Sequence, residues 1–208
     1  MACKHKFYDD LELKKIDFKP TILFVGTFNP AWPASNYAEW FYGRTDANYF
    51  WEVLPGLFNE RSMLCSKPHD WKTFCKRNKL AVTDMIKEIT TADMKNDLHK
   101  EMLSKYGDDE IVKHFLDGLT PTDINEILTR HTTIQKVYLT RTASGYWGKL
   151  WNETKKNARP DVRFVELLTP SRYASYQLSK FRKNNVDVPI SLPQFILKRW
   201  KEAIEAAG

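Results

Sequence analysis

Four short, mainly apolar runs constrain the fold of this sequence most. They are rich in β-branched and aromatic residues, and they cover residues 21–26, 80–86, 136–140 and 163–168. Runs of this length and composition are typical of parallel strands that are buried on both faces. Segments with helical spacing lie between and after them, so strand and helix alternate along the chain.

The helical segments are those expected of elements that cover a sheet. We expect helices over residues 49–58, 71–79, 93–106, 109–118 and 122–129, one through Trp147 and Trp151, and a last one over Leu192–Ala206. Thr120 or Thr122 suits the N-cap of the 122–129 helix. The alternation predicts an α/β protein with three αβα layers around a mostly parallel four-stranded sheet. No linker or repeat divides the chain, so we expect one domain over residues 1–208.

Charge and composition narrow the partners and the compartment. Lys and Arg total 32 against 26 Asp and Glu, and the net charge of +6 favours an anionic partner. No run approaches the ~20 apolar residues of a membrane span, and the first residues lack the pattern of a signal peptide. We therefore expect an intracellular protein, cytoplasmic or, in a eukaryote, nuclear. Three scattered cysteines and histidines without metal spacing predict neither a metal nor a cofactor.

Polar residues follow the first apolar run directly. Ligands of parallel α/β sheets bind beyond the carboxyl ends of the strands, which makes the loops after the strands the places to search. The first run ends at Gly26, and Thr27, Phe28, Asn29 and Pro30 follow it. Glycine permits a close backbone approach, and an amide side chain stands at the strand end. Taken alone, an Asn-Pro pair in this place is more often a turn than a site.

A second segment makes the pattern specific. Residues 41–51 read FYGRTDANYFW, which places Asn48 and a Tyr-Gly pair among aromatic residues just before a helix. After the fourth run, residues 168–175 read LTPSRYAS, a loop rich in Pro and Ser. The three segments together resemble the uracil-DNA glycosylase superfamily, nearest its mismatch-specific and hypoxanthine branches. The resemblance extends over nearly the whole domain.

The resemblance implies a monofunctional DNA glycosylase that hydrolyses the N-glycosidic bond of a deaminated base, uracil or hypoxanthine, in base excision repair. Such an enzyme flips the base out of the duplex, stacks it on an aromatic ring and reads its edge by hydrogen bonds. Asn29 or Asn48 would position the water or recognise the base, and the choice between them stays open. Around the base the resemblance places Gly26, Phe28 and Tyr42, the latter two for stacking, and the backbone N–H groups of Thr27 and Phe28.

The third segment implies how the protein would hold DNA. In the superfamily this loop enters the DNA, which suggests contacts from Pro170, Ser171, Arg172, Tyr173 and Ser175. Arg172 and Tyr173 would fill the gap in the duplex or contact phosphate, and the serines would donate to phosphate oxygens. Basic residues also outnumber acidic ones between Lys155 and Lys201, which suits a polyanion. The expected partner is DNA, and the expected state is a monomer.

The first turn shows no well-placed Asp or His, so we expect a mechanism that positions water without strong general-base catalysis, which typically contributes ~10²–10⁴-fold. Asp46 is the only carboxylate nearby in the sequence, and we interpret it as an N-cap of the following helix.

Two other functions are compatible with the sequence. Ala31, Arg44 and Ser175 stand where the superfamily tends to show Gly, His-Pro and Asn. These differences permit a non-catalytic module that keeps the glycosylase fold and binds DNA or another protein. A third hypothesis is a nucleotide hydrolase that uses the same strand-end pocket. Cleavage assays on lesion-containing duplexes distinguish the three.

Overall fold

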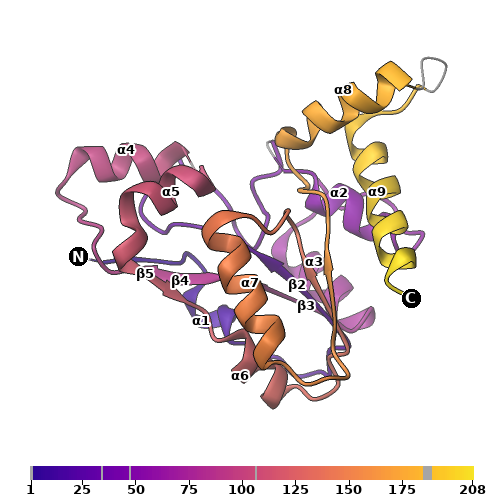
Figure 1. The fold of residues 1–208 in the computed structure, drawn as a ribbon, viewed down its shortest axis with the longest axis horizontal. Coiled ribbons are helices and arrows are strands. Elements are labelled where there is room, and N and C mark those ends of the chain that lie inside the picture. The colour runs from indigo at the N-terminus through magenta and orange to yellow at the C-terminus, as the bar shows by residue number, and fades with distance from the viewer. Residues whose placement is uncertain (1, 34, 47, 106, 185–188) are drawn as a thin grey trace.

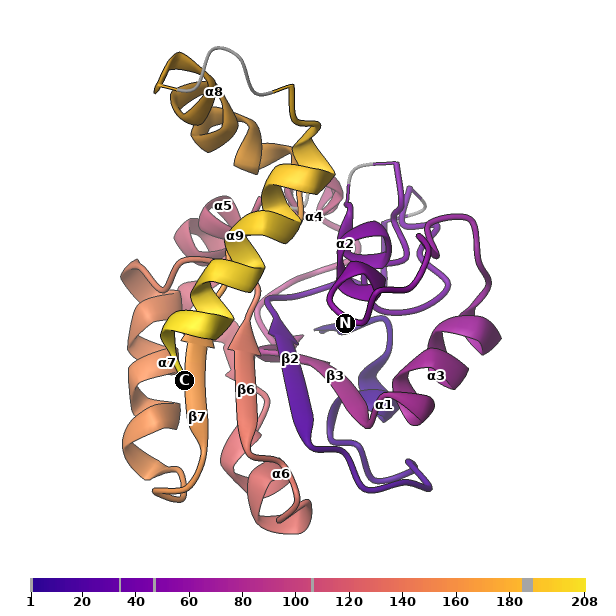
Figure 2. The ribbon, with the colours of Figure 1, turned by 90° about the vertical axis from the view of Figure 1, so that its right-hand side faces the viewer.

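The computed structural model describes residues 2–33, 35–46, 48–105, 107–184 and 189–208. Its centre is a four-stranded parallel sheet in the order β3-β2-β6-β7. The strands are β2 (Ile22–Gly26), β3 (Leu80–Asp84), β6 (Lys136–Leu139) and β7 (Arg163–Glu166). All four predicted strands are confirmed, and the sheet is parallel throughout. Figure 2 shows the four strands side by side, with their carboxyl ends toward α8 (Ser175–Asn184).

Alternating side chains give the sheet two buried faces. Phe24 and Tyr138 point to one face, which α2 (Phe50–Gly56), α3 (Pro68–Arg77) and α9 (Leu192–Ala206) cover. Leu23 and Val137 point to the other, which α6 (Ile124–Arg130) and α7 (Gly145–Asn157) cover. The three-layer αβα prediction is therefore confirmed. Trp147 and Trp151 on α7 and Trp200 on α9 are buried in this core.

The helix boundaries agree with prediction most closely at the end of the chain. α9 has the predicted bounds. Ser191 and Gln194 form a capping box that fixes its start. The N-cap predicted for α6 is wrong. Asp123 occupies it and accepts a hydrogen bond of 2.8 Å from the backbone N–H of Glu126, whereas Thr120 belongs to the strand β5 (Leu119–Pro121).

A second, antiparallel sheet was not predicted. It pairs β1 (Cys3–Lys4), β4 (Ile86–Ile89) and β5 in the order β1-β4-β5. Ile86 was expected to end the second strand of the parallel sheet, yet it opens β4, so the chain changes sheets at Met85. The short helix α1 (Tyr8–Leu11) follows β1.

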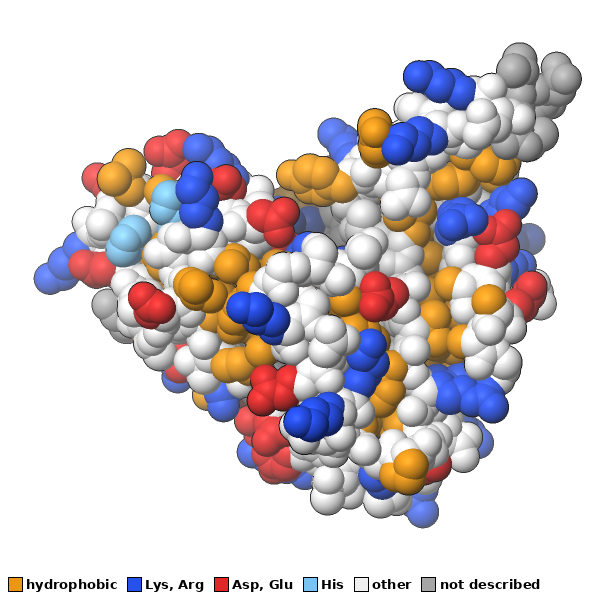
Figure 3. All heavy atoms as spheres, viewed as in Figure 1, with side chains coloured by type: hydrophobic (Ala, Val, Ile, Leu, Met, Phe, Trp, Pro, Cys, Tyr) orange, Lys and Arg blue, Asp and Glu red, His pale blue; other side chains and the backbone are white. Residues whose placement is uncertain are grey.

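Two lobes extend beyond the carboxyl edge of the parallel sheet. One consists of α4 (Asp97–Lys105) and α5 (Asp108–Phe115), and the other is an arm formed by α8, a helix that the sequence did not predict. Figure 1 shows them on opposite sides of the molecule, and Figure 3 shows the surface hollowed between them. Within the described residues, no helix has the length and apolar character needed to span a membrane.

Candidate functional site

A cavity of about 410 Å³ opens at the carboxyl edge of the parallel sheet. It collects residues from the loops that follow β2, β6 and β7, from the end of β3 and from the α4–α5 lobe. Its lining residues are Gly26, Thr27, Phe28, Asn29, Tyr42, Arg44, Asn48, Asp84, Lys105, Asp108, Thr140, Arg141, Thr169, Pro170, Ser171, Arg172 and Tyr173. All the site residues predicted from the sequence are among them except Ser175, which is exposed at the start of α8.

Backbone pairing holds the second and third sequence segments together. Asn48 and Ser171 form an antiparallel bridge, and the N–H of Tyr49 donates to the carbonyl of Pro170 at 2.6 Å. At the rim, the Arg172 guanidinium donates to the carbonyl of Asp46 at 2.8 Å. Segments more than a hundred residues apart in the sequence thus form one wall of the cavity.

Tyr42 lies inside this wall in a fixed orientation. Its backbone is left-handed, with φ of 56°, and its ring stacks on Phe50 with centroids 3.8 Å apart. The hydroxyl of Thr140 donates to the carbonyl of Val25 at 3.2 Å, so it accepts from the Tyr42 hydroxyl at 2.7 Å. Burial raises the pKa of Tyr42 well above its usual value, which keeps this hydroxyl protonated.

Phe28, the other aromatic residue predicted to stack on a base, is mostly part of the core. Its side chain is only 7% exposed, and its ring meets that of His5 edge-on, with centroids 5.8 Å apart. Phe28 therefore offers the cavity a small part of its surface.

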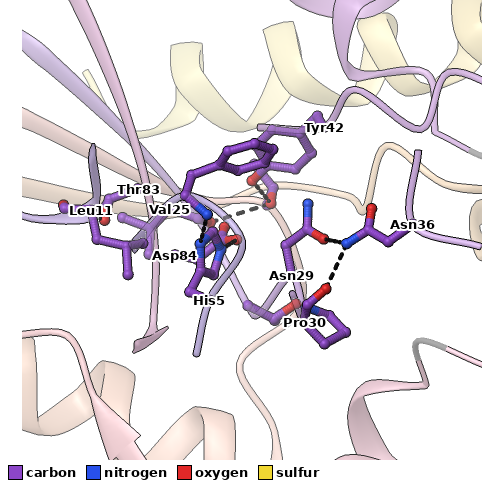
Figure 4. Close-up of polar contacts among 12 residues, drawn as sticks. His5, Leu11, Val25, Asn29, Pro30, Asn36, Tyr42, Thr83 and Asp84 are labelled. Atoms are coloured by element: carbon purple, nitrogen blue, oxygen red, sulfur yellow. Dashed lines mark hydrogen bonds and ion pairs between the residues drawn. The ribbon is translucent and has the colours of Figure 1, made fainter. Parts of the chain in front are cut away.

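The amide of Asn29 has one orientation, because its neighbour Asn36 is fixed. The Asn36 Nδ2 donates to the carbonyl of Pro30 at 2.6 Å, and its Oδ1 accepts from the N–H of Ala38 at 3.3 Å. Nδ2 also donates to Oδ1 of Asn29. The Nδ2 group of Asn29 lies away from Asn36, on the side of Tyr42 (Figure 4), and both Asn29 and Tyr42 line the cavity. Sequence reasoning missed Asn36.

A carboxylate closes the cavity beside the first turn. Asp84 ends β3 in register with Gly26. A Cβ atom added to Gly26 would lie 2.1 Å from Oδ1 of Asp84 and 2.6 Å from the Tyr42 hydroxyl, so only glycine admits both groups.

The His5 side chain is hydrogen-bonded to the Asp84 carboxylate (Figure 4). The N–H of Phe7 donates to Nδ1 of His5 at 2.9 Å, so Nδ1 carries no proton. The proton of this neutral imidazole is on Nε2, which donates to Oδ2 of Asp84 at 2.7 Å. The N-terminal segment thus positions a carboxylate at the site.

Asp108, the first residue of α5, is the second carboxylate in the cavity. It accepts from the Thr27 hydroxyl at 2.8 Å through Oδ1, and from Arg141 Nη1 at 2.8 Å through Oδ2. The Arg141 guanidinium lies 5.1 Å from the centre of the Trp147 ring. Burial raises the pKa of Asp108 from 3.8 to about 6, although Arg141 and Thr27 both oppose this shift.

Two expectations about acidic groups are therefore wrong. Asp84 and Asp108 both lie near the first turn, where we expected no carboxylate. Asp46 does not cap a helix, because α2 begins at Phe50 with Tyr49 at its N-cap, and Asp46 accepts from the Tyr37 hydroxyl instead. Asp84 is the charged residue within the apolar run 80–86 and could have been found by that position, whereas no local signal marks His5 or Asp108.

The described residues contain no group of three or more His, Cys, Asp or Glu side chains that could hold a metal ion. Cys3 and Cys75 are buried free thiols, and Cys65 is exposed. The cavity thus presents amides, hydroxyls, carboxylates and basic groups, a set suited to hydrogen bonding and proton transfer.

Comparison of the sequence with models of known families gives no match. Comparison with curated proteins gives none either. Among solved structures, the chain is similar to a solution NMR structure from Methanosarcina acetivorans named "a putative Uracil DNA glycosylase". The TM-score is 0.49 at 16% sequence identity, over 88% of this chain and 92% of that chain.

Proposed function

We propose that this protein is a monofunctional DNA glycosylase that hydrolyses the N-glycosidic bond of uracil or hypoxanthine in DNA. One observation carries the proposal: the three segments that resemble the uracil-DNA glycosylase superfamily line a single cavity at the carboxyl edge of the sheet. A volume of about 410 Å³ is within the range of small-ligand sites, so a flipped base can enter.

Asn29 is the amide best placed to bind the base. Its Oδ1 is occupied by Asn36, so its Nδ2 can donate to a carbonyl oxygen of uracil or hypoxanthine. A donor fixed in this way stabilises the negative charge that the departing base acquires. Asn48 has a further task, because its Oδ1 accepts from the N–H of Phe50 at 2.8 Å and fixes the start of α2.

The rim of the cavity fits a DNA strand. Tyr173 is 80% exposed beside the cavity, where an aromatic ring can occupy the space of the flipped base. The adjoining arm α8 carries Lys180, Arg182 and Lys183 and has no acidic residue. In Figure 3 basic side chains lie along this arm, beside the hollow. Phosphates of the flanking strand would meet these cations.

The test is cleavage of labelled duplexes that contain one uracil or one hypoxanthine, read as nicks after alkali treatment. We expect the wild type to cleave at least one of them. Asn29→Ala should lose ~10²–10³-fold in rate, the usual cost of removing one fixed donor to a developing anion. Asn152→Ala, an exposed asparagine on α7, is the matched control and should cleave at the wild-type rate.

Asn48→Ala belongs in the same assay, because the sequence left the two asparagines equivalent. We expect a smaller loss of rate than for Asn29→Ala, accompanied by a lower melting temperature. Binding of both duplexes without cleavage would contradict the proposal and favour a DNA-binding module. Hydrolysis of free nucleotides alone would favour the nucleotide hydrolase.

A further inference from the structure

We infer that Asp108 is a catalytic carboxylate, which accepts a proton from the water that attacks C1′ of the damaged nucleotide. The inference rests on the proposed function and adds a proton acceptor to it. Asp108 reaches the cavity from α5, outside the three segments that the sequence singled out.

The geometry around Asp108 holds the carboxylate still and leaves it accessible. Thr27 binds one oxygen and Arg141 the other, each at 2.8 Å. Each carboxylate oxygen has two acceptor sites, so one site on each oxygen remains for a water molecule. The side chain is 32% exposed and lines the cavity, so a water bound there lies within the space that the base and sugar would enter.

Asp84 is less suited to this step. Its residue is 6% exposed, its Oδ2 accepts from His5, and its Oδ1 is packed toward Gly26 and Tyr42. Asp84 therefore acts as a fixed negative charge beside the positive charge that builds on the sugar, and Asp108 is the more accessible proton acceptor.

Burial makes Asp108 a stronger base than an ordinary aspartate. Burial is the largest cause that raises its pKa to about 6, and the charges of Asp84 and Asp109 raise it further. Arg141 and the Thr27 hydroxyl lower it. Lys105, at the end of α4, is a further cationic residue that lines the cavity. A base with a pKa near the working pH is still ionised at neutral pH and accepts protons better than one with a pKa near 4.

The step balances as a hydrolysis. A water oxygen forms a bond to C1′, and the C1′–N bond breaks with its electron pair going to the base. The proton that leaves the water goes to Asp108, and the departing base, stabilised by the Asn29 amide, takes a proton from solvent after it leaves. Asp108 then releases its proton to solvent.

The test is the single-turnover rate of base excision between pH values of about 4.5 and 8.5. The wild-type rate should rise with pH to a plateau, with a midpoint near 6. Asp108→Asn keeps an acceptor for the Thr27 hydroxyl but cannot take the proton. We expect it to lose ~10²-fold or more in plateau rate and to lose the rise with pH.

Thr27→Val gives a second readout, because it removes a hydrogen bond that favours the charged carboxylate. It should shift the midpoint to higher pH, a change that a merely structural contact between α5 and the sheet would not produce. Asp109→Asn is the matched control, because the side chain of this neighbour is 89% exposed. The substitution should leave the plateau rate unchanged. It should lower the midpoint only slightly, because the charge of Asp109 raises the pKa of Asp108.

The outcomes are distinguishable. A wild type that excises neither base overturns the proposed function, and the inference about Asp108 falls with it. An active wild type whose Asp108→Asn variant keeps the same plateau rate and the same midpoint overturns the inference alone. If Asp108→Asn does not fold, an unshifted midpoint in Thr27→Val overturns it as well.

Discussion

Asp108 is packed between Thr27 and Arg141, and burial raises its pKa from 3.8 to about 6. The folded protein therefore binds this proton more tightly than the unfolded chain does. The resulting stabilisation is fully present below pH 3.8 and is lost as pH rises through about 6. This direction is opposite to that of a carboxylate whose pKa an ion pair lowers.

Asp108→Asn should reveal this dependence in the free energy of unfolding, measured with urea from about pH 4 to pH 7. Relative to the variant, the wild type should lose stability as pH rises. The full pKa shift corresponds to about 3 kcal/mol, and the loss should be smaller than this because part of the side chain is hydrated. Asp109→Asn should run parallel to the wild type. A difference between wild type and Asp108→Asn that is constant over this pH range would contradict the raised pKa.

Residues differ in how far the sequence could place them. Gly26, Asn29 and Tyr42 lie in segments that follow a strand or precede a helix, and topology brings such segments to one edge of the sheet. His5 follows the unpredicted strand β1, and Asp108 opens α5. Their partners Asp84 and Thr27 are 79 and 81 residues away in the chain. Only tertiary packing creates such contacts, so no local pattern could predict them.

At the scale of elements, the buried strands were predictable and the exposed or very short ones were not. The parallel strands are apolar runs, so their sequence reveals them. β1 has two residues and β4 reads IKEI, so neither has a periodic pattern that would predict a strand. Both form strands because they pair with each other in the folded protein. The start of α8 was concealed by the Pro-Ser sequence before it, which is typical of a turn.

β1 is small, yet the segment around it is hydrogen-bonded to the carboxyl edge of the parallel sheet. The N–H of His5 donates to Lys87 O at 2.8 Å, and the N–H of Lys6 donates to Asn29 O at 2.7 Å. The chain therefore connects the antiparallel sheet to the first turn, and the His5–Asp84 hydrogen bond adds a buried side-chain link. Because both partners are buried, loss of one leaves the other unsatisfied.

His5→Ala should therefore lower the free energy of unfolding by about 2–4 kcal/mol, since it leaves the Asp84 carboxylate buried without its donor. In an Asp84→Asn background the same change should cost at least about 1 kcal/mol less, which a double-mutant cycle in urea measures. His69→Ala, an exposed histidine on α3, is the control and should stay within about 0.5 kcal/mol. Additive costs for the two substitutions would refute the link.

At the scale of the whole molecule, the basic residues lie at different distances from the cavity. α8 and the α4–α5 lobe both project beyond the carboxyl ends of the strands (Figures 1 and 2). Lys155 and Lys156 lie in the last turn of α7, which leads back to the start of β7 at the opposite edge. Arg159, in the same connection, donates to the carbonyls of Leu128 and Ile134. The basic residues that the sequence grouped together thus divide between two ends of the molecule.

This division predicts which lysines control DNA binding. Lys180→Glu with Lys183→Glu on α8 should weaken binding of a lesion-free duplex by about 10-fold or more, and should reduce the slope of log K against log salt by about 1–2. Lys155→Glu with Lys156→Glu makes the same change in charge at the other edge and should leave both quantities near wild type. Fluorescence anisotropy over a salt series measures them. Equal losses in the two variants would show that net charge governs binding, and a larger loss in the α7 variant would place the DNA away from the cavity.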